Sequence, residues 1–483
     1  MRSIIHVVGW LLVGEAAAMA VPAAADGLAG SSDWTAFAIS SFVTAGVGGA
    51  LVLASGGKRP GTVTVRETFM LTTLAWTVLS VFAALPFAFS STKLSVVDSL
   101  YEATSGLTTA GGTVIVGLDA LPPGPLLWRI LLNWIGGIGI VAMTLLVFPF
   151  LRVGGMQLFR TESSDRSDKL FGQAQDLAAT IATVYVTLTM LSALGFYLAG
   201  MPWFDAIAHG MSAVSTGGFS TRDASLAAFP GVAHYWVATV SMIAGALPMT
   251  YYVRFWLQGR EAFHDQQVRT FISFLLAAWA VMAGWAMLQT DLPDEMAVHE
   301  ILAHVAVNVT SVVTTTGLAS DDYGAWGGFA TAAFFALFFV GGCTGSTSGS
   351  IKIFRWQVLI LSLRAQLRRM VTPHRVTMVI YAGKALTDDV VQSVVNFVVV
   401  FVLAFAALSL ALAWTGLDFL SATSAVASAL SGVGPGLGDV VGPAGNYTSL
   451  SPAAKLTLCF AMLLGRLEVL TVLVLLTPGF WKR

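Results

Sequence analysis

The sequence predicts an all-α integral membrane protein with about ten spanning helices, in which a helix, a short helix and a second helix recur four times. Three observations predict this class. Of the 483 residues, 56% are hydrophobic and 11% are charged, against roughly 25% charged in soluble proteins. Apolar runs long enough to cross a bilayer recur along the chain. Shorter apolar segments between them each end in a polar turn that contains glycine.

Apolar runs of about 20 residues, the length that crosses about 30 Å of hydrocarbon, predict about ten spanning helices. They lie near residues 4–21, 36–55, 68–90, 126–151, 177–200, 233–257, 270–289, 328–345 continuing to about 362, 391–414 and 453–478. Four stretches have a helical pattern but are too short to cross, so we expect re-entrant half-helices there. These stretches lie near residues 96–110, 204–216, 300–315 and 419–431.

The first apolar segment also resembles a secretory signal peptide. Arg2 and an apolar run precede small residues at Ala23-Ala24-Ala25, as at a cleavage site. Glu15 argues against this interpretation, because a carboxylate inside the apolar part of a signal peptide is unusual. We therefore expect residues 1–25 to be retained as a transmembrane helix.

The positions of Lys and Arg predict which ends of the helices face the cytoplasm. When the spans alternate from a cytoplasmic N-terminus, 20 of the 25 basic residues fall on that side: Arg2, Lys58, Arg59, Arg66, Arg152, Arg160, Arg166, Lys169, Arg254, Arg260, Arg269, Lys352, Arg355, Arg364, Arg368, Arg369, Arg375, Lys384, Lys482 and Arg483. The C-terminus is then cytoplasmic as well. The four half-helices lie towards the opposite face, where acids such as Asp98, Asp205 and Asp439 concentrate cations.

Net charge argues against one class of partner. The formal charge of -1 leaves no basic excess for phosphate contacts, so we expect no nucleic acid to bind. The basic stretch Arg364–Arg375 is suited to anionic membrane lipid or to a cytoplasmic partner.

Each half-helix runs into a turn rich in hydroxyl groups and glycine. The turns contain Thr108-Thr109-Ala110-Gly111, Ser215-Thr216-Gly217-Gly218, Thr315-Thr316-Gly317 and Gly432-Val433-Gly434. Their last glycines are separated by 107, 99 and 117 residues. Irregular backbone at membrane depth persists only where it lines a cavity, and glycine allows successive carbonyl oxygens to face the same way. We therefore expect the carbonyls of Gly111, Gly218, Gly317 and Gly434 to replace the hydration shell of a transported K+ ion.

The segment Gly341–Ser350 interrupts an apolar run with glycine and hydroxyl residues. Its composition suggests a phosphate-binding loop, but that motif needs Lys directly after its last glycine, and Ser350 stands there. We reject nucleotide binding and expect a barrier inside the membrane. The gating residues of this prediction are Gly345, Ser346, Thr347, Ser348 and Gly349.

Arg466 lies near the middle of the last apolar segment, where a charged side chain is costly and normally functional. We expect it to bind carbonyls of the 341–350 loop and to belong to the gate. The alternative is a structural arginine paired with Glu468, Glu102 or another acid.

Neither the cysteines nor the histidines predict a cofactor. Cys343 and Cys459 lie far apart in apolar stretches and indicate neither a disulfide framework nor a metal site. His299 and His304 are five residues apart and do not share a helix face, and His209 stands alone before the second turn. We expect no cofactor in this chain and no enzymatic activity. A membrane redox subunit stays a remote alternative, which an absorption spectrum would identify.

Ordered motifs run along nearly the whole chain. They are Arg66-Glu67-Thr68-Phe69, Tyr101–Gly106, Trp128-Arg129, Trp134–Gly139, Gly155–Ser163, Ser215–Arg222, Gly341–Lys352 and Leu464–Val469. With the four turns they resemble the Trk/Ktr/HKT superfamily of potassium transporters, and most closely its bacterial TrkH/TrkG branch. One departure is the first turn, which reads Thr-Ala-Gly-Gly where the family pattern has Thr-Thr-Gly-Ala.

The resemblance implies potassium uptake across the bacterial inner membrane through four covalently linked helix–pore-helix–helix repeats. We expect two N-terminal helices in 1–60 and repeats over 66–152, 176–258, 268–370 and 386–483. It also implies a gating loop beneath a selectivity filter, a homodimer, and a cytoplasmic TrkA-like regulatory ring, which alone would bind a nucleotide. Gly111 is read as favouring potassium, because serine there accompanies sodium permeation in the plant branch. A sodium-permeable or H+- or Na+-coupled symporter on the same architecture remains an open alternative.

Overall fold

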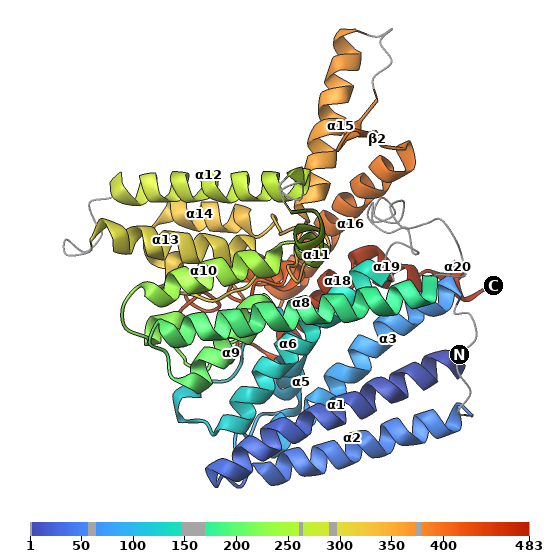
Figure 1. Ribbon diagram of the computed structural model, residues 1–483, viewed down its shortest axis with the longest axis vertical. Helices are drawn as coiled ribbons and strands as arrows, with labels where there is room; N and C mark the ends of the chain where they lie inside the picture. The colour runs from blue at the N-terminus through green and yellow to red at the C-terminus, as the bar shows by residue number, and fades with distance from the viewer. Residues whose placement is uncertain are drawn as a thin grey trace.

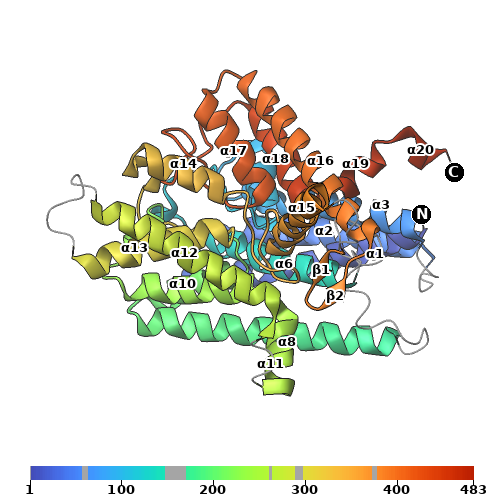
Figure 2. The ribbon, with the colours of Figure 1, turned by 90° about the horizontal axis from the view of Figure 1, so that it is seen from above.

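The computed structural model describes residues 2–56, 64–146, 170–259, 264–288, 297–372 and 378–482. Within these ranges it has the predicted helical membrane fold, two N-terminal helices followed by four repeats (Figures 1 and 2). Several residues used in the sequence predictions lie outside the described residues. They are Lys58, Arg59, Arg152, Arg160, Arg166, Lys169, Arg260, Arg375, Arg483 and the motif Gly155–Ser163.

The N-terminal helices α1 (Arg2–Ala29) and α2 (Trp34–Ala54) form an antiparallel pair at the lower edge of Figure 1. Small residues bring their backbones together, as is common between membrane helices. A Cβ atom added at Gly9 would lie 2.8 Å from the carbonyl oxygen of Gly48.

The first repeat contains α3 (Val65–Ala83), α4 (Leu85–Phe89), the half-helix α5 (Val96–Leu107), η1 (Leu118–Ala120) and α6 (Pro123–Leu146). Capping residues fix where two of these helices begin. Thr64 accepts a hydrogen bond from the backbone N–H of Glu67 at the start of α3, and Ser95 accepts one from Asp98 at the start of α5.

The second repeat contains α8 (Leu170–Leu198), the half-helix α9 (Trp203–Val214), η3 (Ser225–Ala228), α10 (Ala233–Ala246) and α11 (Met249–Gln258). The span expected over 233–257 is not straight, since α10 and α11 meet at 90°. Pro248 stands between them, and proline cannot continue the hydrogen-bond ladder of a helix.

The third repeat contains α12 (Gln266–Leu288), the half-helix α13 (Val298–Val313), η5 (Tyr323–Trp326), α14 (Gly328–Leu337) and α15 (Ile353–Val371). The 341–350 loop separates α14 from α15. The latter projects away from the body at the top of Figure 1. A short hairpin of β1 (Ile380–Tyr381) and β2 (Lys384–Ala385) follows and pairs Ile380 with Ala385.

The fourth repeat contains α16 (Asp388–Ala413), the half-helix α17 (Phe419–Ser431), α18 (Pro452–Arg466), α19 (Val469–Leu475) and α20 (Pro478–Trp481). The span expected over 453–478 is broken too, since α18 and α19 meet at 111°. Glu468 has a φ of 65° at this break, a conformation that no α-helix contains. Arg466 therefore ends a helix rather than lying in the middle of one.

Among the described residues, seven helices are long and apolar enough to cross a membrane, or nine when each bent pair counts as one span. Both termini lie at the same end of these helices, at the right of Figures 1 and 2. The largest buried cluster joins residues of the first and fourth repeats, such as Tyr101, Leu107, Val426 and Leu458. The last repeat thus closes against the first.

Candidate functional site

The four turns after the half-helices share one backbone conformation. Counted over the four residues 108–111, 215–218, 314–317 and 431–434, the second residue of each turn has positive φ. The values are 53° at Thr109, 50° at Thr216, 58° at Thr315 and 74° at Gly432. Two residues later φ is positive again, at 81° for Gly111, 80° for Gly218, 88° for Gly317 and 107° for Gly434. The fourth turn has glycine at the second position where the other three have threonine. The chain thus makes the same turn four times.

A hydrogen bond that closes the end of each half-helix sets this conformation. The residue before each last glycine donates its N–H to the carbonyl of a serine five residues earlier. The pairs are Ala110 with Ser105 (2.9 Å), Gly217 with Ser212 (2.9 Å), Thr316 with Ser311 (2.7 Å) and Val433 with Ser428 (3.0 Å). These serines were not among the predicted site residues. Their signal is a serine six residues before the last glycine in all four repeats.

The four turns close into a ring, which we call the glycine ring (residues 108–111, 215–218, 314–317 and 431–434). A Cβ atom added at each last glycine would meet a carbonyl oxygen of the next turn in sequence order. The contacts are Gly111 with Gly217 (2.7 Å), Gly218 with Thr316, Gly317 with Val433, and Gly434 with Ala110 (3.0 Å). Glycine is required at these positions for two reasons, the positive φ and the neighbouring backbone.

The glycine ring carries backbone carbonyls without protein partners. Within the described part of the chain, no hydrogen bond reaches the carbonyl oxygens of the second and third residue of any turn. These are Thr109, Ala110, Thr216, Gly217, Thr315, Thr316, Gly432 and Val433. The six of these eight residues that are not glycine are each at most 1% exposed. Since a buried carbonyl without a partner is costly, such a set of oxygens is suited to binding a cation.

Polar side chains of the half-helices hold the chain just beyond each turn. Three of them, Glu102, His209 and Asn308, stand nine residues before the last glycine, and Ser424 stands ten residues before it. Their hydrogen bonds join Glu102 to the N–H of Val114 (2.9 Å), His209 to the hydroxyl of Ser220 (3.0 Å), Asn308 to the N–H of Ser320 (3.0 Å) and Ser424 to the N–H of Leu437 (2.9 Å). His304 also contacts the hydroxyl of Ser320, at 2.8 Å. These contacts give both histidines a structural role.

A buried ion pair inside the first repeat also contacts the second repeat. Arg129 Nε lies 2.6 Å from Glu102 Oε1, with both side chains at most 1% exposed. The same guanidinium donates to the carbonyl of Ser220 at 2.9 Å and lies 4.2 Å from the ring centroid of Phe219. Arg129 therefore fixes the chain just beyond the second turn.

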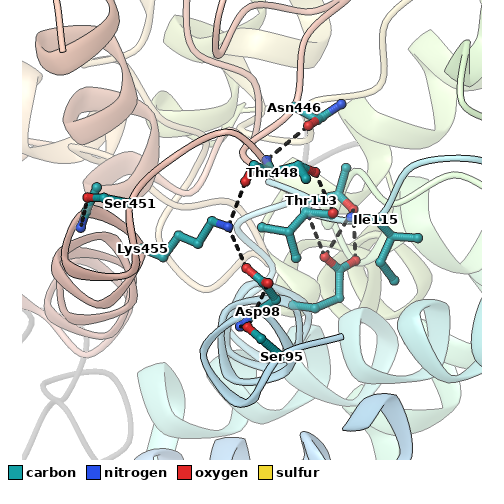
Figure 3. Close-up of polar contacts among 11 residues, drawn as sticks. Ser95, Asp98, Thr113, Ile115, Asn446, Thr448, Ser451 and Lys455 are labelled. Carbon is teal, nitrogen blue, oxygen red and sulfur yellow. Dashed lines mark hydrogen bonds and ion pairs between the residues drawn. The ribbon is translucent and has the colours of Figure 1, made fainter. Parts of the chain in front are cut away.

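A second ion pair joins the fourth repeat to the first. Lys455 Nζ lies 2.5 Å from Asp98 Oδ1 and donates to the carbonyl of Thr448 at 2.8 Å (Figure 3). The Thr448 hydroxyl donates to the carbonyl of Val114 at 2.6 Å. The segment after the fourth turn is thereby held against the chain beyond the first turn.

Two small cavities lie on opposite sides of the glycine ring. The outer one, of about 80 Å³, is lined by Gly111, Gly218 and Gly317 together with Arg222 and Asp223. The inner one, of about 30 Å³, is lined by the ends of the first and fourth half-helices, by the 341–350 loop and by residues beneath it. The lining includes Thr108, Gly432, Ser348, Lys352 and Arg466.

The 341–350 loop lies directly beneath the glycine ring. The Thr347 hydroxyl donates to the carbonyl of Val214 at 3.0 Å, at the end of the second half-helix. Gly349 donates its N–H to the Thr315 hydroxyl at 2.6 Å. A Cβ atom added at Gly349 would collide with the carbonyl of Ser431. The loop therefore touches the second, third and fourth turns at once.

The remaining predicted loop residues shape its fold. Gly345 has a φ of 82° and accepts a hydrogen bond from the N–H of Met249 at 3.0 Å. The Ser346 hydroxyl donates to the carbonyl of Cys343 at 2.6 Å, and Ser348 donates to or accepts from the Thr315 hydroxyl at 3.2 Å.

Two buried cations hold the loop from below. Arg466 Nη1 donates to the carbonyl of Thr347 at 2.8 Å, the kind of partner that we predicted for it. Lys352 Nζ donates to the carbonyl of Ser348. The charge pattern assigned Lys352 to the cytoplasmic face, but the structure buries it to 7% exposed.

The acids proposed as alternative partners of Arg466 bind other cations. Glu102 pairs with Arg129, and Glu468 Oε2 lies 2.7 Å from Arg355 Nη2. Arg355 is 1% exposed, so it lies inside the protein.

Comparison with known proteins gives consistent matches. The TrkH model, described as a cation transport protein, matches residues 35–482. The chain is 46% identical over 419 residues to the Trk system potassium uptake protein TrkI of Halomonas elongata, covering 86% of this chain and 84% of that protein. It is 35% identical over 498 residues to the Trk system potassium uptake protein TrkH of Escherichia coli, covering 100% and 99%. The crystal structure of the potassium transporter TrkH from Vibrio parahaemolyticus superposes with a TM-score of 0.91 at 33% identity, covering 100% and 99%.

Proposed function

Because the chain belongs to the TrkH family of cation transport proteins, we propose that it carries potassium ions into the cell across the bacterial inner membrane. It is a membrane transporter and not an enzyme. The observation that carries the proposal is the glycine ring, with eight carbonyl oxygens that accept no hydrogen bond from any described residue.

The glycine ring is the selectivity filter of this proposal. Its ion-binding residues are Thr108, Thr109, Ala110, Gly111, Ser215, Thr216, Gly217, Gly218, Thr315, Thr316, Gly317, Gly432, Val433 and Gly434. An entering potassium ion exchanges water for two successive rings of four carbonyl oxygens, one from the second residues of the four turns and one from the third residues. The field of several carbonyls favours potassium over smaller ions. The half-helices end at the ring, so their C-terminal partial negative charge also stabilises a cation there.

The 341–350 loop and Arg466 form the gate. Loop hydroxyls contact the second and third turns, and Gly349 packs against the fourth. The inner cavity of about 30 Å³ has room for only one or two waters. A hydrated ion leaving the ring meets the loop, and Arg466 and Lys352 place positive charge below it. Opening requires residues 345–349 to leave their contacts with the turns.

The assembly is a homodimer regulated by a cytoplasmic TrkA-like ring that binds the nucleotide. The relatives are named as parts of a Trk system, which supports a protein with more than one component. Both termini lie at one end of the helices (Figure 1), and the basic residues gathered there support a cytoplasmic position. The projecting end of α15 carries Arg364, Arg368 and Arg369, which are suited to contact with lipid headgroups or with the regulatory ring.

The function is tested by expressing the protein in a potassium-uptake-deficient bacterium on low potassium, alone and with a regulatory ring. We expect growth, and rubidium uptake into vesicles. Gly218→Ala should abolish both, because its Cβ collides with the carbonyl of Thr316. Gly231→Ala is the matched control, since Gly231 has a similar φ of 82° but a Cβ there meets open space among the described residues. A well-expressed protein that moves no rubidium would refute the proposal.

The same vesicles separate a passive pathway from the coupled alternative. Uptake driven by a fixed membrane potential should persist after proton and sodium gradients are removed. Loss of uptake on removal of either gradient would instead establish an H+- or Na+-coupled symporter.

A further inference from the structure

The fourth turn of the glycine ring differs from the other three at its last carbonyl. Gly434 O accepts a hydrogen bond from the Tyr447 hydroxyl at 2.8 Å and another from the Ser428 hydroxyl at 2.9 Å. In the part of the chain that the structure describes, no hydrogen bond reaches the carbonyl oxygens of Gly111, Gly218 or Gly317. A carbonyl oxygen has two lone pairs, so both acceptor positions of Gly434 are occupied by protein.

Tyr447 is held firmly in this position. Its backbone N–H donates to the carbonyl of Thr113 at 2.9 Å, just beyond the first turn, and its side chain is 3% exposed. Its ring packs against Tyr101, with the centroids 5.4 Å apart. The next residue, Thr448, is anchored to Val114 and to Lys455 (Figure 3). The hydroxyl therefore cannot leave Gly434 by simple rotation of an exposed side chain.

The local sequence also sets this turn apart. Gly434 precedes Pro435, whose ring restricts the conformations of the residue before it. Its φ of 107° differs from the 80° to 88° of the other three last glycines. The other turns continue with Gly112, Phe219 and Leu318.

We propose that Tyr447 and Ser428 remove the Gly434 carbonyl from the filter. The outermost ring then binds potassium with three backbone carbonyls, those of Gly111, Gly218 and Gly317, and water completes the coordination. The two inner rings keep all four carbonyls. This inference rests on the proposed potassium filter and adds an order of events, because the ion sheds its last water only after it has passed the outer ring. Tyr447 acts as a positioning residue.

The first test removes one hydroxyl. Tyr447→Phe keeps the ring packing but frees one lone pair of the Gly434 carbonyl, which then adds a fourth ligand at the outer ring. We expect the rubidium concentration that half-saturates uptake to fall by about two- to tenfold, the range of one hydrogen-bond-sized interaction. Tyr101→Phe is the matched control, because the Tyr101 hydroxyl is buried beside it without a partner among the described residues. A purely structural tyrosine predicts an unchanged or raised value in Tyr447→Phe, and either result overturns the proposal.

The second test needs no variant. Crystals grown in rubidium show ion positions by anomalous scattering. We expect outer-ring rubidium in contact with the carbonyls of Gly111, Gly218 and Gly317, with Gly434 still bonded to Tyr447. Rubidium in contact with Gly434 as well would overturn this inference and leave the proposed function standing. Absence of both rubidium from the ring and rubidium uptake would instead overturn the proposed function.

Discussion

The cations that hold the chain on the outer side of the glycine ring have different partners from the cations that hold the 341–350 loop on its inner side. On the outer side Arg129, Arg222 and Lys455 each pair with a carboxylate, at 2.6, 2.9 and 2.5 Å. On the inner side Arg355 pairs with Glu468 at 2.7 Å, but the two cations that contact the 341–350 loop, Arg466 and Lys352, donate to its carbonyls. Within the described residues neither of these two forms an ion pair with an acid.

This difference indicates that the outer ion pairs form a fixed frame, which we call the outer frame, and that the inner side is movable. Breaking a buried ion pair leaves an uncompensated charge, which is strongly destabilising, so the outer pairs fix the turns in place. A hydrogen bond from a cation to a neutral carbonyl is cheaper to exchange, because water or another carbonyl can replace it. Changes on the outer side should therefore lower stability, and changes on the inner side should alter flux.

The largest effect is expected from Arg129→Met, which leaves Glu102 as a buried charge without its partner. We expect a loss of about 3–5 kcal/mol in the free energy of unfolding, the usual cost of breaking a buried pair, measured by thermal unfolding in detergent. Arg222→Met is the control, because its side chain is 35% exposed, and the loss there should stay near 1 kcal/mol. Equal losses in the two variants would contradict the idea of a buried outer frame.

The inner side is probed by Arg466→Ala and by deletion of residues 346–350. Removing a charge-assisted hydrogen bond of about 1.5–3 kcal/mol should shift the proposed gate towards opening. We expect rubidium uptake without the regulatory ring to rise about tenfold or more, with little change in unfolding temperature. Arg364→Ala, on the exposed face of α15, should leave uptake unchanged. If both inner variants transport like the unmodified protein at normal expression, the loop is not the gate.

Sequence reasoning located the parts of the fold that depend on composition and repetition. The length of an apolar run identifies a span. Four turns at comparable spacings indicated the glycine ring, because each repeat makes the same turn after its half-helix. It missed the breaks at Pro248 and Glu468, since hydropathy registers that a segment is apolar and not which way it points.

The contacts that distinguish one side of the ring from the other were also out of reach. Lys352 carries the same charge in the sequence whether it faces the cytoplasm or the underside of the ring, and only packing decides. Tyr447 reaches Gly434 and Thr113 because the last repeat folds back onto the first. Such contacts between distant segments leave no local pattern. Arg466 was predictable because a charge inside an apolar run is anomalous by itself.

The ring between the two sides is tested by Gly111→Ser. Its Cβ would lie 2.7 Å from the carbonyl of Gly217, and the residue must keep a φ of 81°. We expect the preference for rubidium over sodium to fall by about two- to tenfold, as one carbonyl shifts by a hydrogen-bond-sized free energy. Gly117→Ser is the matched control, because Gly117 has a similar φ of 78° and a Cβ there meets open space among the described residues. Unchanged selectivity in Gly111→Ser would remove this residue from the filter.

The smallest effect is expected from Thr448→Val, which deletes one neutral hydrogen bond of the outer frame and keeps the Lys455–Asp98 pair. The carbonyl of Val114 loses its 2.6 Å partner, so we expect a loss of about 0.5–1.5 kcal/mol in the free energy of unfolding. Rubidium uptake measured without the regulatory ring should not rise. Thr457→Val is the matched control, because among the described residues that hydroxyl bonds only to the Ala453 carbonyl of its own helix, at 2.9 Å. A variant that keeps full stability but conducts faster would place Thr448 with the gate, and the division between a fixed outer side and a movable inner side would fail.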